Sequence, residues 1–516
     1  MILLWLLGKI HHTAVSLSTT RSLTQRPSSK RTTTSALALS KHVPTTNTNT
    51  SSSSSLTEES CPFSIKFPRY RVDLTTTTRS SSKSKRNNHK SWWSFLFPTI
   101  SHASSSSWWN KQQRQQQQVI EKRYSKKDPN HTTTVQWYNG STATTDELVL
   151  EIWTKLWQVA SAMTLSTPTI SDDSTTSTTT VLVFPNLDDT LILQQWMEVL
   201  DWIQTNKNNI NNKKKDAVVR LNVTLVDDSL EIPPLLEMTV TKSKIHTLPT
   251  TTTTTTTQQP QPRWDPAIIE QQMKAWVNRV LVQMKICPFT KSTTMSGQGL
   301  ANLGVPVARI VYHTSQASPT DDYHMIHIMS DAWTAIQNMV EAGPQGRDGI
   351  SSILMAAPSY NEDLMEWLPV FALLEAGILA TKLPEQIGVV CFHPKYLTPD
   401  GSNFPGFGHM HSVPRLQGWV QAQLDDNDRT ASKGNQNPDT LSPLAASLTV
   451  TDIAAGGAWQ RRTPHATINV LRADQLQAAE GKRDSKQMYT RNICTLLEVG
   501  NDELQQALER EQRLGL

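Results

Sequence analysis

Two residues in the C-terminal half of the sequence have side chains that could carry chemistry, and a proline follows each of them. Cys287 ends an amphipathic stretch, and His393 follows a short apolar run. A thiol can act as a nucleophile or redox group, and an imidazole can act as an acid or base near neutral pH. The alternatives are a small buried apolar residue for Cys287 and a backbone-capping role for His393.

Arginines and neighbouring polar residues surround the last strand that the sequence predicts. Arginine is well suited to holding a carboxylate or a phosphate. We therefore predict a site for an anionic small molecule, with Cys287 and His393 as its catalytic residues. The alternative is a set of solvated or ion-paired surface arginines. The predicted substrate-binding residues are Arg462, Arg472, Tyr489, Arg491 and Asn492.

A metal site is the less favoured interpretation of the same residues. Cys391 and His393 are two residues apart and would share one face of a strand, so with Cys287 they could supply three zinc ligands. The spacing matches no standard zinc pattern, and we predict no metal. The cofactor stays unknown, because the sequence has no Walker loop, dinucleotide fingerprint, nucleophile elbow or HExxH motif. The four cysteines include no CxxC pair, which favours reduced thiols.

The elements that would position these residues alternate from residue 265 onwards. Helical spacing of apolar residues predicts helices at 266–284, 325–340, 362–381, 486–498 and 502–513, and apolar runs predict strands at 305–313, 350–357, 387–393 and 467–472. This alternation predicts an α/β fold, or else α+β, with a single mixed or parallel sheet of about four strands covered by helices. Residues 404–460 lack periodicity and are predicted to be an irregular insertion.

The predicted topology brings the candidate residues together. In sheets with crossover helices, the loops after the strands share one edge, and that edge carries sites. We therefore expect Cys287 and His393 to lie close in space, with Arg472 or Arg491 beside them.

Residues 131–245 are predicted to form a second, smaller α/β unit. Its helix at 148–163 resembles 269–284, its strand at 180–185 resembles 353–358, and 217–226 matches 387–393. Either this unit is a degenerate copy of the C-terminal fold, or two βα units are alike by chance. It lacks the cysteine and the histidine in either case.

Low-complexity tracts separate these parts of the chain. Stretches rich in Ser, Thr, Gln and Asn bury too little apolar surface to offset the entropy lost on ordering. Residues 1–130 are therefore predicted to be a disordered basic tail, 246–262 a Thr/Gln linker, and 263–516 the main domain. The net charge of +4 comes from residues 1–120, with 16 Lys and Arg against 3 Asp and Glu. No nucleic-acid partner is expected for the folded part, because that part is acidic.

The basic tail has the composition of an organelle transit peptide. The first acidic residue is Glu58, and Ser, Thr, Lys and Arg dominate before it. We expect recognition by an organelle import machinery, with plastid and mitochondrion both open. A basic stretch at 83–90 followed by an apolar one at 92–100 resembles an internal signal; a stray aromatic patch is the alternative. No segment reaches the ~18–20 apolar residues of a membrane span, so we expect a soluble protein.

Five short motifs in order resemble the bacterial domain of unknown function 1415 family. They are Ile286-Cys287-Pro288-Phe289-Thr290, the strand end Ala357-Pro358, Cys391-Phe392-His393-Pro394-Lys395-Tyr396, the run from Arg461 to Asp474, and Met488-Tyr489-Thr490-Arg491-Asn492. The resemblance spans Trp264 to about Leu508, without the insertion. The chain departs from the family by replacing two histidines with Ala357 and Asn469 and two glutamates with Ala473 and Thr490.

The resemblance implies a fold and a candidate site, but no reaction. Two functions stay open at this point. One is an organelle-targeted enzyme or binder of an anionic small molecule. The other is a non-catalytic scaffold or partner-binding protein that keeps the family fold, which the replaced histidines favour.

Overall fold

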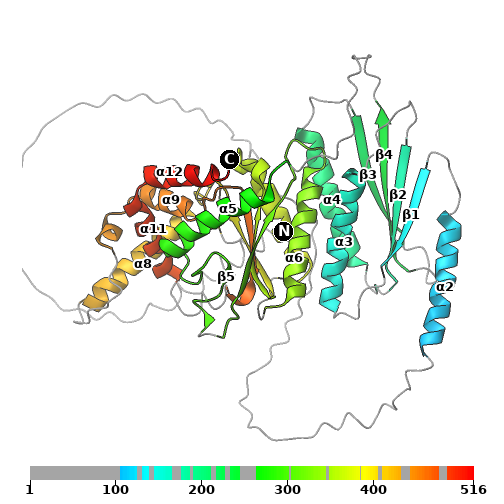
Figure 1. Ribbon diagram of the computed structural model, residues 1–516, viewed down its shortest axis with the longest axis horizontal. Helices are drawn as coiled ribbons and strands as arrows, with labels where there is room; N and C mark the ends of the chain where they lie inside the picture. The colour runs from blue at the N-terminus through cyan, green and yellow to red at the C-terminus, as the bar shows by residue number, and fades with distance from the viewer. Residues whose placement is uncertain are drawn as a thin grey trace, which may run out of the picture. The chain divides into compact units, whose positions relative to one another are not determined.

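The structure is a computed structural model that describes residues 105–516 with gaps at 125–130, 139–144, 166–175, 186, 188–189, 211–216, 227–232, 245–262, 302–303, 345–347, 384, 405–409, 432–441 and 476–484. The chain divides into two parts, Met1–Asn88 and His89–Leu516. The first part, the predicted transit segment, the signal-like segment at 83–100 and the linker at 246–262 lie outside the described residues. The second part contains two sheets (Figure 1). We call residues 105–244, which contain the first sheet, the middle domain, and residues 263–516, which contain the second, the C-terminal domain.

The middle domain is a four-stranded mixed sheet. Its elements are α2 (Ser105–Tyr124), β1 (His131–Trp137), α3 (Thr145–Leu165), β2 (Thr176–Val183), α4 (Leu191–Ile210), β3 (Ala217–Val226) and β4 (Leu235–Lys244). The strand order is β1-β2-β4-β3. β1 and β2 are parallel, while β4 is antiparallel to both of its neighbours.

Helix α2 corrects the expectation that residues 1–130 are disordered throughout. Its sequence is rich in Gln, Lys, Arg and Glu, which favour helix. Ile120 near its C-terminal end is fully buried and packs with Val181, Val183 and Leu235 of the sheet. The sequence pattern did not predict this helix, because Ile120 is the one buried side chain among residues 114–124 and gives only a weak periodic signal.

The C-terminal domain is a five-stranded mixed sheet of order β5-β6-β7-β9-β8. Its strands are β5 (Met295–Ser296), β6 (Ala308–Thr314), β7 (Ile350–Ala356), β8 (Ile387–Phe392) and β9 (Thr467–Arg472). β6 and β7 are parallel, and β9 lies antiparallel between β7 and β8. The predicted α/β class with one mixed sheet covered by helices is confirmed for this domain, and the sheet has five strands where about four were expected.

Helices cover both faces of this sheet (Figure 1). One face packs against α5 (Pro266–Trp276), α11 (Ser485–Val499) and α12 (Asn501–Gln512), in a core that includes Trp276, Val390 and Phe392. The other face packs against α6 (His324–Ala342) and α7 (Leu364–Ala380). Because β8 is buried on both faces, Cys391 and Phe392 are both almost inaccessible to solvent.

Residues 404–460 are not an irregular insertion, as the sequence suggested. They contain α8 (Val413–Ala431), the short turn η5 (Pro443–Ser447) and α9 (Val450–Trp459). Leu416, Val420 and Ile453 bury against Ile493 of α11. Gly456 lets α9 approach Ile493 closely, since an added Cβ would lie 2.8 Å from that side chain. In the sequence, Gly456 suggested a loop, but in the structure it allows two helices to pack closely.

The two domains have the same topology. Apart from β5, which pairs antiparallel with β6 and has no counterpart among the described strands of the middle domain, the two sheets correspond. In each, two parallel strands (β1 and β2, or β6 and β7) are followed by two more strands, and the last of these lies antiparallel between its two neighbours. By chain order α3 corresponds to α6, and α2 to α5, so the sequence-based match of 148–163 with 269–284 is wrong. The strand matches of 180–185 with 353–358 and of 217–226 with 387–393 agree with this order.

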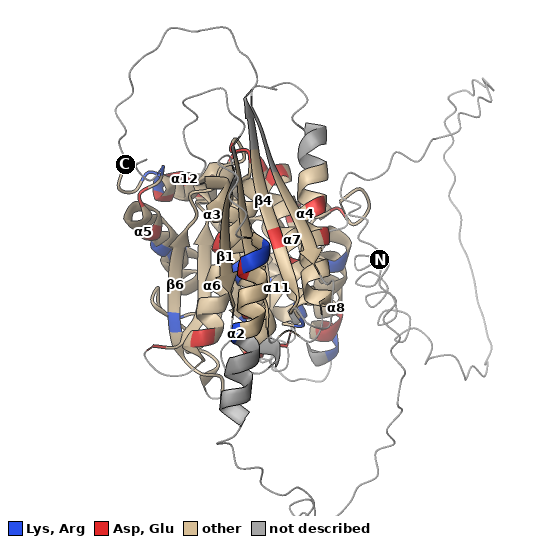
Figure 2. Ribbon diagram, turned by 90° about the vertical axis from the view of Figure 1, so that its right-hand side faces the viewer, with Lys and Arg blue, Asp and Glu red and all other residues tan. Residues whose placement is uncertain are grey.

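Basic and acidic residues are interspersed over the described elements (Figure 2). Residues 263–516 carry 21 Lys and Arg against 26 Asp and Glu. Among the described residues, no helix combines the length and the apolar character that crossing a membrane requires.

Candidate functional site

The carboxyl ends of β6, β7 and β8 lie at one edge of the C-terminal sheet. The start of β9 joins them there, since Thr467 pairs with both Ala356 and Phe392. Residues 357–361, 393–396 and 461–466 follow or precede these ends, and we call them the carboxyl edge. The prediction that His393 lies at such an edge agrees with this register.

His393 is fully buried at the carboxyl edge, and both of its ring nitrogens are engaged. The backbone N–H of Lys395 donates to Nδ1 at 3.0 Å, so Nε2 must carry the proton that it donates to the Tyr360 carbonyl at 2.9 Å. Burial lowers the pKa of His393 to about 4. The imidazole is therefore neutral at pH 7, and its only basic nitrogen is already occupied by a backbone donor.

A second buried histidine, His465, has the same arrangement and was not singled out from the sequence. The Asn361 amide donates to its Nδ1 at 3.0 Å, and its Nε2 donates to Oε1 of Gln272 at 2.6 Å. Burial lowers the pKa of His465 to about 4. Gln272 continues the network to the carbonyls of Gln512 and Leu514. The signal available in the sequence was a histidine directly after Pro464 and before a strand.

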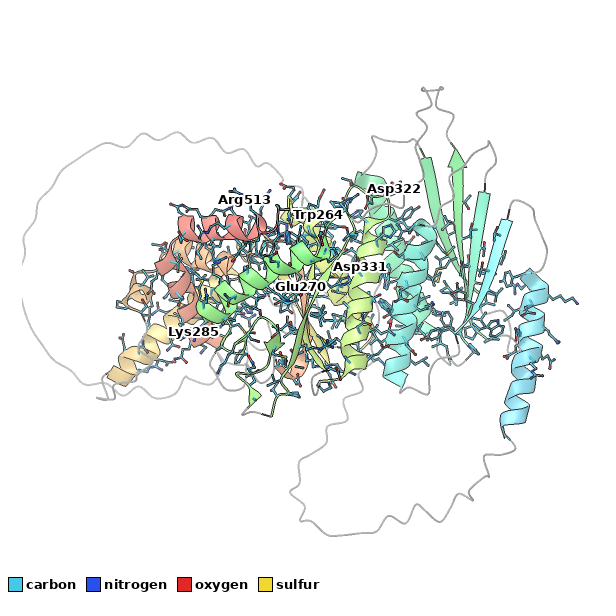
Figure 3. All side chains as sticks on the ribbon, in the orientation of Figure 1. Trp264, Glu270, Lys285, Asp322, Asp331 and Arg513 are labelled. Atoms are coloured by element: carbon cyan, nitrogen blue, oxygen red, sulfur yellow. The ribbon has the colours of Figure 1, made fainter. Side chains whose placement is uncertain are left out.

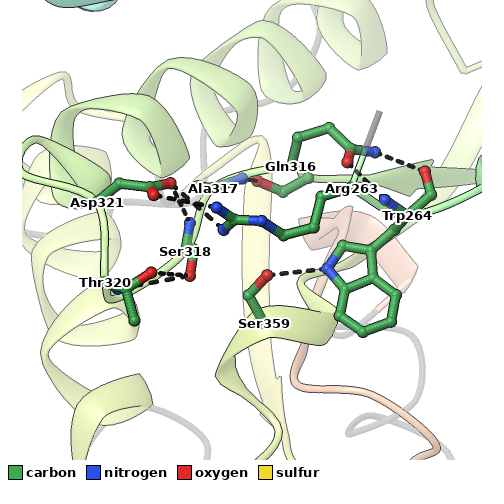
Figure 4. Close-up of polar contacts among 9 residues, drawn as sticks. Arg263, Trp264, Gln316, Ala317, Ser318, Thr320, Asp321 and Ser359 are labelled. Carbon is green, nitrogen blue, oxygen red and sulfur yellow. Dashed lines mark hydrogen bonds and ion pairs between the residues drawn. The ribbon is translucent and has the colours of Figure 1, made fainter. Parts of the chain in front are cut away.

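The first residues of the domain lie across the loop that follows β6 (Figure 4). The Trp264 indole donates to the Ser359 hydroxyl at 2.9 Å, and its backbone exchanges two hydrogen bonds with Gln316. Arg263 forms an ion pair with Asp321 at 3.2 Å. The polar groups after β6 and β7 are thus joined to the start of the domain itself.

Cys287 lies at the far end of the segment that Trp264 begins. α5 continues into the π-helix η2 (Val277–Gln283), and Lys285 follows with a positive φ of 56°. At 1.5 Å per residue, this segment carries the chain roughly 25–30 Å from its start. Trp264 and Lys285 accordingly mark its two ends in Figure 3.

Two of the predicted binding residues hold this loop, which we call the Cys287 loop (285–290). Arg491 donates to the Lys285 carbonyl at 3.1 Å, and Asn492 donates to the Ile286 carbonyl at 3.0 Å and to Gln460 at 3.2 Å. Cys287 is half-buried, with its Sγ 3.4 Å from the Thr290 hydroxyl. Cys287, Arg491 and Asn492 therefore belong to one neighbourhood.

The side chains of Cys287 and His393 bond to different residues, and the expectation that they share one site stays a prediction. Ile286 belongs to the core on the α5 face. The His393 ring instead contacts Tyr360, whose own ring packs on Trp367 of α7, the helix on the other face.

Two further predicted binding residues, Arg462 and Tyr489, lie in two different surroundings. Arg462 lies over the Trp459 ring at 4.4 Å and donates to the Tyr396 carbonyl, and burial lowers its pKa. The Tyr489 hydroxyl is 2.9 Å from Nε2 of His411, in an aromatic group with Trp419.

Arg472 is at the opposite end of the sheet from His393. It pairs with Ile387, at the start of β8, while Phe392 at the end of β8 pairs with Thr467. Five residues of strand separate the two ends by roughly 17 Å. The guanidinium donates to the Ile350 and Met339 carbonyls at 2.7 and 2.6 Å. The prediction that Arg472 lies beside His393 is wrong, because β9 is antiparallel to β8.

Cys391, weighed above as a zinc ligand, is buried against α7, and burial raises the pKa of its thiol. In the part of the chain that the structure describes, no three His, Cys, Asp or Glu side chains are grouped so as to hold a metal ion.

The fold and its carboxyl edge define an α/β protein with a mixed sheet between two helical layers. A family profile described as "Protein of unknown function (DUF1415)" matches residues 268–404. The match contains Cys287 and His393 and supports the resemblance predicted from the sequence motifs. It ends before Arg462, so the motifs at 461–474 and 488–492 lie outside it. Comparisons with curated proteins and with solved structures found no match.

Proposed function

We propose that the C-terminal domain is a scaffold that binds a partner and keeps the family fold without its own catalysis. The observation that carries this proposal is the bonding of His393. A general base needs a free lone pair within reach of a substrate proton. The only lone pair of His393 accepts the Lys395 N–H, and the ring is fully buried.

The arginines support the same interpretation. Arg472 and Arg491 each donate to backbone carbonyls, and Arg462 packs on a tryptophan while donating to another carbonyl. Guanidinium groups used in this way hold segments of the chain together. These hydrogen bonds stabilise the ends of helices and strands, which supports a structural role for the three arginines.

The test compares His393→Gln with Cys287→Ser in the full-length chain. If His393 is structural, His393→Gln lowers the melting temperature by several degrees, since a buried pair of hydrogen bonds is lost. Cys287→Ser should change it little, because the thiol is half-exposed. A His393→Gln protein that melts like wild type but loses a measurable turnover or ligand would contradict the proposal.

The Cys287 loop supports a second candidate function, a site for an anionic small molecule. A half-exposed thiol, the Arg491 guanidinium and the Asn492 amide meet there. The test is the rate of Cys287 alkylation by iodoacetamide, with and without inorganic phosphate or acetate. Binding beside the thiol would slow alkylation in wild type and not in Arg491→Ala. Equal rates in both proteins at all anion concentrations would end this candidate.

Delivery to an organelle is proposed for the N-terminal tail on its composition alone. Residues 1–120 are basic and contain three acidic residues, the composition that import machineries recognise. A fusion of residues 1–120 to a fluorescent protein should enter a plastid or a mitochondrion. A diffuse cytosolic signal would contradict delivery.

A further inference from the structure

The middle and C-terminal domains contact each other through corresponding helices. α3 follows the first strand of the middle domain, and α6 follows β6, which corresponds to that strand. The Trp153 and Trp333 rings meet edge to face, with centroids 5.6 Å apart. Each tryptophan is followed by a threonine, Thr154 and Thr334. The same two-residue motif thus lies on both sides of the contact.

Polar contacts that follow Trp153 along α3 give the direction of the helices. The Thr154 hydroxyl donates to the Trp333 carbonyl at 3.4 Å, and Ser161 lies 2.9 Å from Nδ1 of His327. From Thr154 to Ser161, two turns along α3, the contacts move back along α6 from Trp333 and Thr334 to His327. The two helices are therefore antiparallel.

These contacts have the form of an isologous interface. In a two-fold dimer, corresponding elements meet in opposite directions, and a residue on the axis contacts its own counterpart. Trp153 and Trp333 occupy corresponding helices and contact each other, as residues on such an axis would. Thr154 and Thr334, the threonines of the two motifs, both bond across the contact, Thr154 to the Trp333 carbonyl and Thr334 to Gln158 at 3.1 Å.

Packing at the axis is close. Trp153 and Trp333 are both buried, at 0 and 1% exposure. An added Cβ on Gly377 of α7 would lie 2.6 Å from the Trp333 ring and 3.3 Å from the Trp153 ring. Close packing around two tryptophans is typical of the energetic centre of a stable interface.

We infer that the chain is an internal pseudo-dimer. The middle domain is a second, diverged copy of the fold of the C-terminal domain, and it occupies the place of a second copy on the α6–α7 surface. The shared strand order and the antiparallel contact between corresponding helices are independent observations that support the same inference. The partner that this surface fits is therefore another domain of the same fold, and the inference does not depend on the proposed function.

The experiment uses the full-length chain with a protease recognition sequence in place of residues 250–257. The folded protein is cleaved there, and its mass is measured by light scattering. The two fragments should stay together as a one-to-one complex. Immediate separation of the fragments would overturn the inference.

Variants locate the contact that holds the fragments. Trp153→Ala and Trp333→Ala should each weaken fragment affinity at least about 30-fold, as expected for a central tryptophan. Trp419→Ala, in α8 among the aromatic residues beside Tyr489, is the matched control and should leave the affinity unchanged. Gln158→Ala removes only the bond to Thr334 and should weaken affinity about 2- to 10-fold, which keeps the test usable if a tryptophan variant fails to fold. Equal affinities for Gln158→Ala, the tryptophan variants and the control would overturn the inference.

The final measurement concerns the kind of partner. After cleavage, the middle fragment is removed by an affinity tag under mild denaturant, and the C-terminal fragment is returned to buffer. With its partner gone, it should pair with itself and run as a dimer, and Trp333→Ala should return it to a monomer. A C-terminal fragment that stays monomeric at tens of micromolar would show that the surface does not accept a second copy.

Discussion

His393 and His465 are neutral hydrogen-bonding groups in the folded protein, and each joins two segments of the carboxyl edge. His465 links Asn361 after β7 to Gln272 of α5. Their depressed pKa values follow from burial, which penalises the imidazolium. A histidine with these bonds contributes to stability only while it stays unprotonated.

The first prediction is a pH dependence that His465→Gln removes. The folded pKa of about 4 lies below the ordinary value of 6.5. Between these values the unfolded chain binds a proton that the folded chain does not, so stability falls as pH drops from 6.5 to 4. The loss is about 3 kcal/mol at most. Urea unfolding at pH 7.5 and 4.5 should show the stability difference between wild type and His465→Gln shrinking at the lower pH. A constant difference would contradict the assignment of a neutral imidazole.

The second prediction has the opposite sign and concerns Glu375 of α7. Burial raises the pKa of this carboxyl to about 8, from 4.5. The folded chain therefore keeps a proton that the unfolded chain has lost, and stability falls as pH rises from 4.5 to 8. Glu375→Gln should match wild type near pH 5 and exceed its stability by roughly 1–3 kcal/mol near pH 8.5. Glu366, whose pKa burial also raises on the same helix, provides a control position.

At the scale of elements, the glycines of the helices decide how closely neighbours approach. Gly377 in α7 faces Trp333, and Gly456 in α9 faces Ile493, each without room for a Cβ. Gly418 in α8 has no atom within 4 Å of the Cβ position. The three positions are alike in local sequence propensity and differ in their surroundings.

The third prediction uses this contrast. Gly418→Ala should stabilise the protein by about 0.5–1 kcal/mol, because alanine favours helix over glycine. Gly377→Ala and Gly456→Ala should destabilise it by about 1–3 kcal/mol, because the added methyl forces packed side chains to move. The free energy of unfolding in urea measures all three. Stabilisation by all three substitutions would show that the helices have room to separate.

At the scale of the whole molecule, the C-terminal domain has its own sheet and two helical layers, but one of these layers is also an interface. α6 uses one side for its own strands and the other for α3. Trp333 packs against Trp153 of α3 on one side and against Gly377 of its own domain on another.

The fourth prediction follows for residues 263–516 produced alone. The domain should keep its cooperative unfolding, because its core between α5 and the sheet is internal. It should also self-associate, because the exposed Trp333 surface is apolar. Sedimentation and thermal unfolding measure the two properties. Loss of cooperative unfolding would show that both domains share one core.

The sequence alone determined most element types of the C-terminal domain outside residues 404–460 and the place of His393 at a strand end. Apolar periodicity is local, so the helices at 325–340 and 502–513 and the strands at 350–357 and 467–472 were found within a residue or two. The helices α2, α8 and α9 were missed, since their buried residues are few or interrupted by glycine.

Only the tertiary structure decided which residues meet. The antiparallel position of β9 between β7 and β8 placed Arg472 at the opposite end of the sheet from His393. Strand order depends on contacts between residues far apart in the chain, which no local pattern encodes. The same holds for Trp153 and Trp333, whose matching motifs lie 180 positions apart in the sequence. Their relation is seen only in the structure, where the two helices that carry them pack against each other.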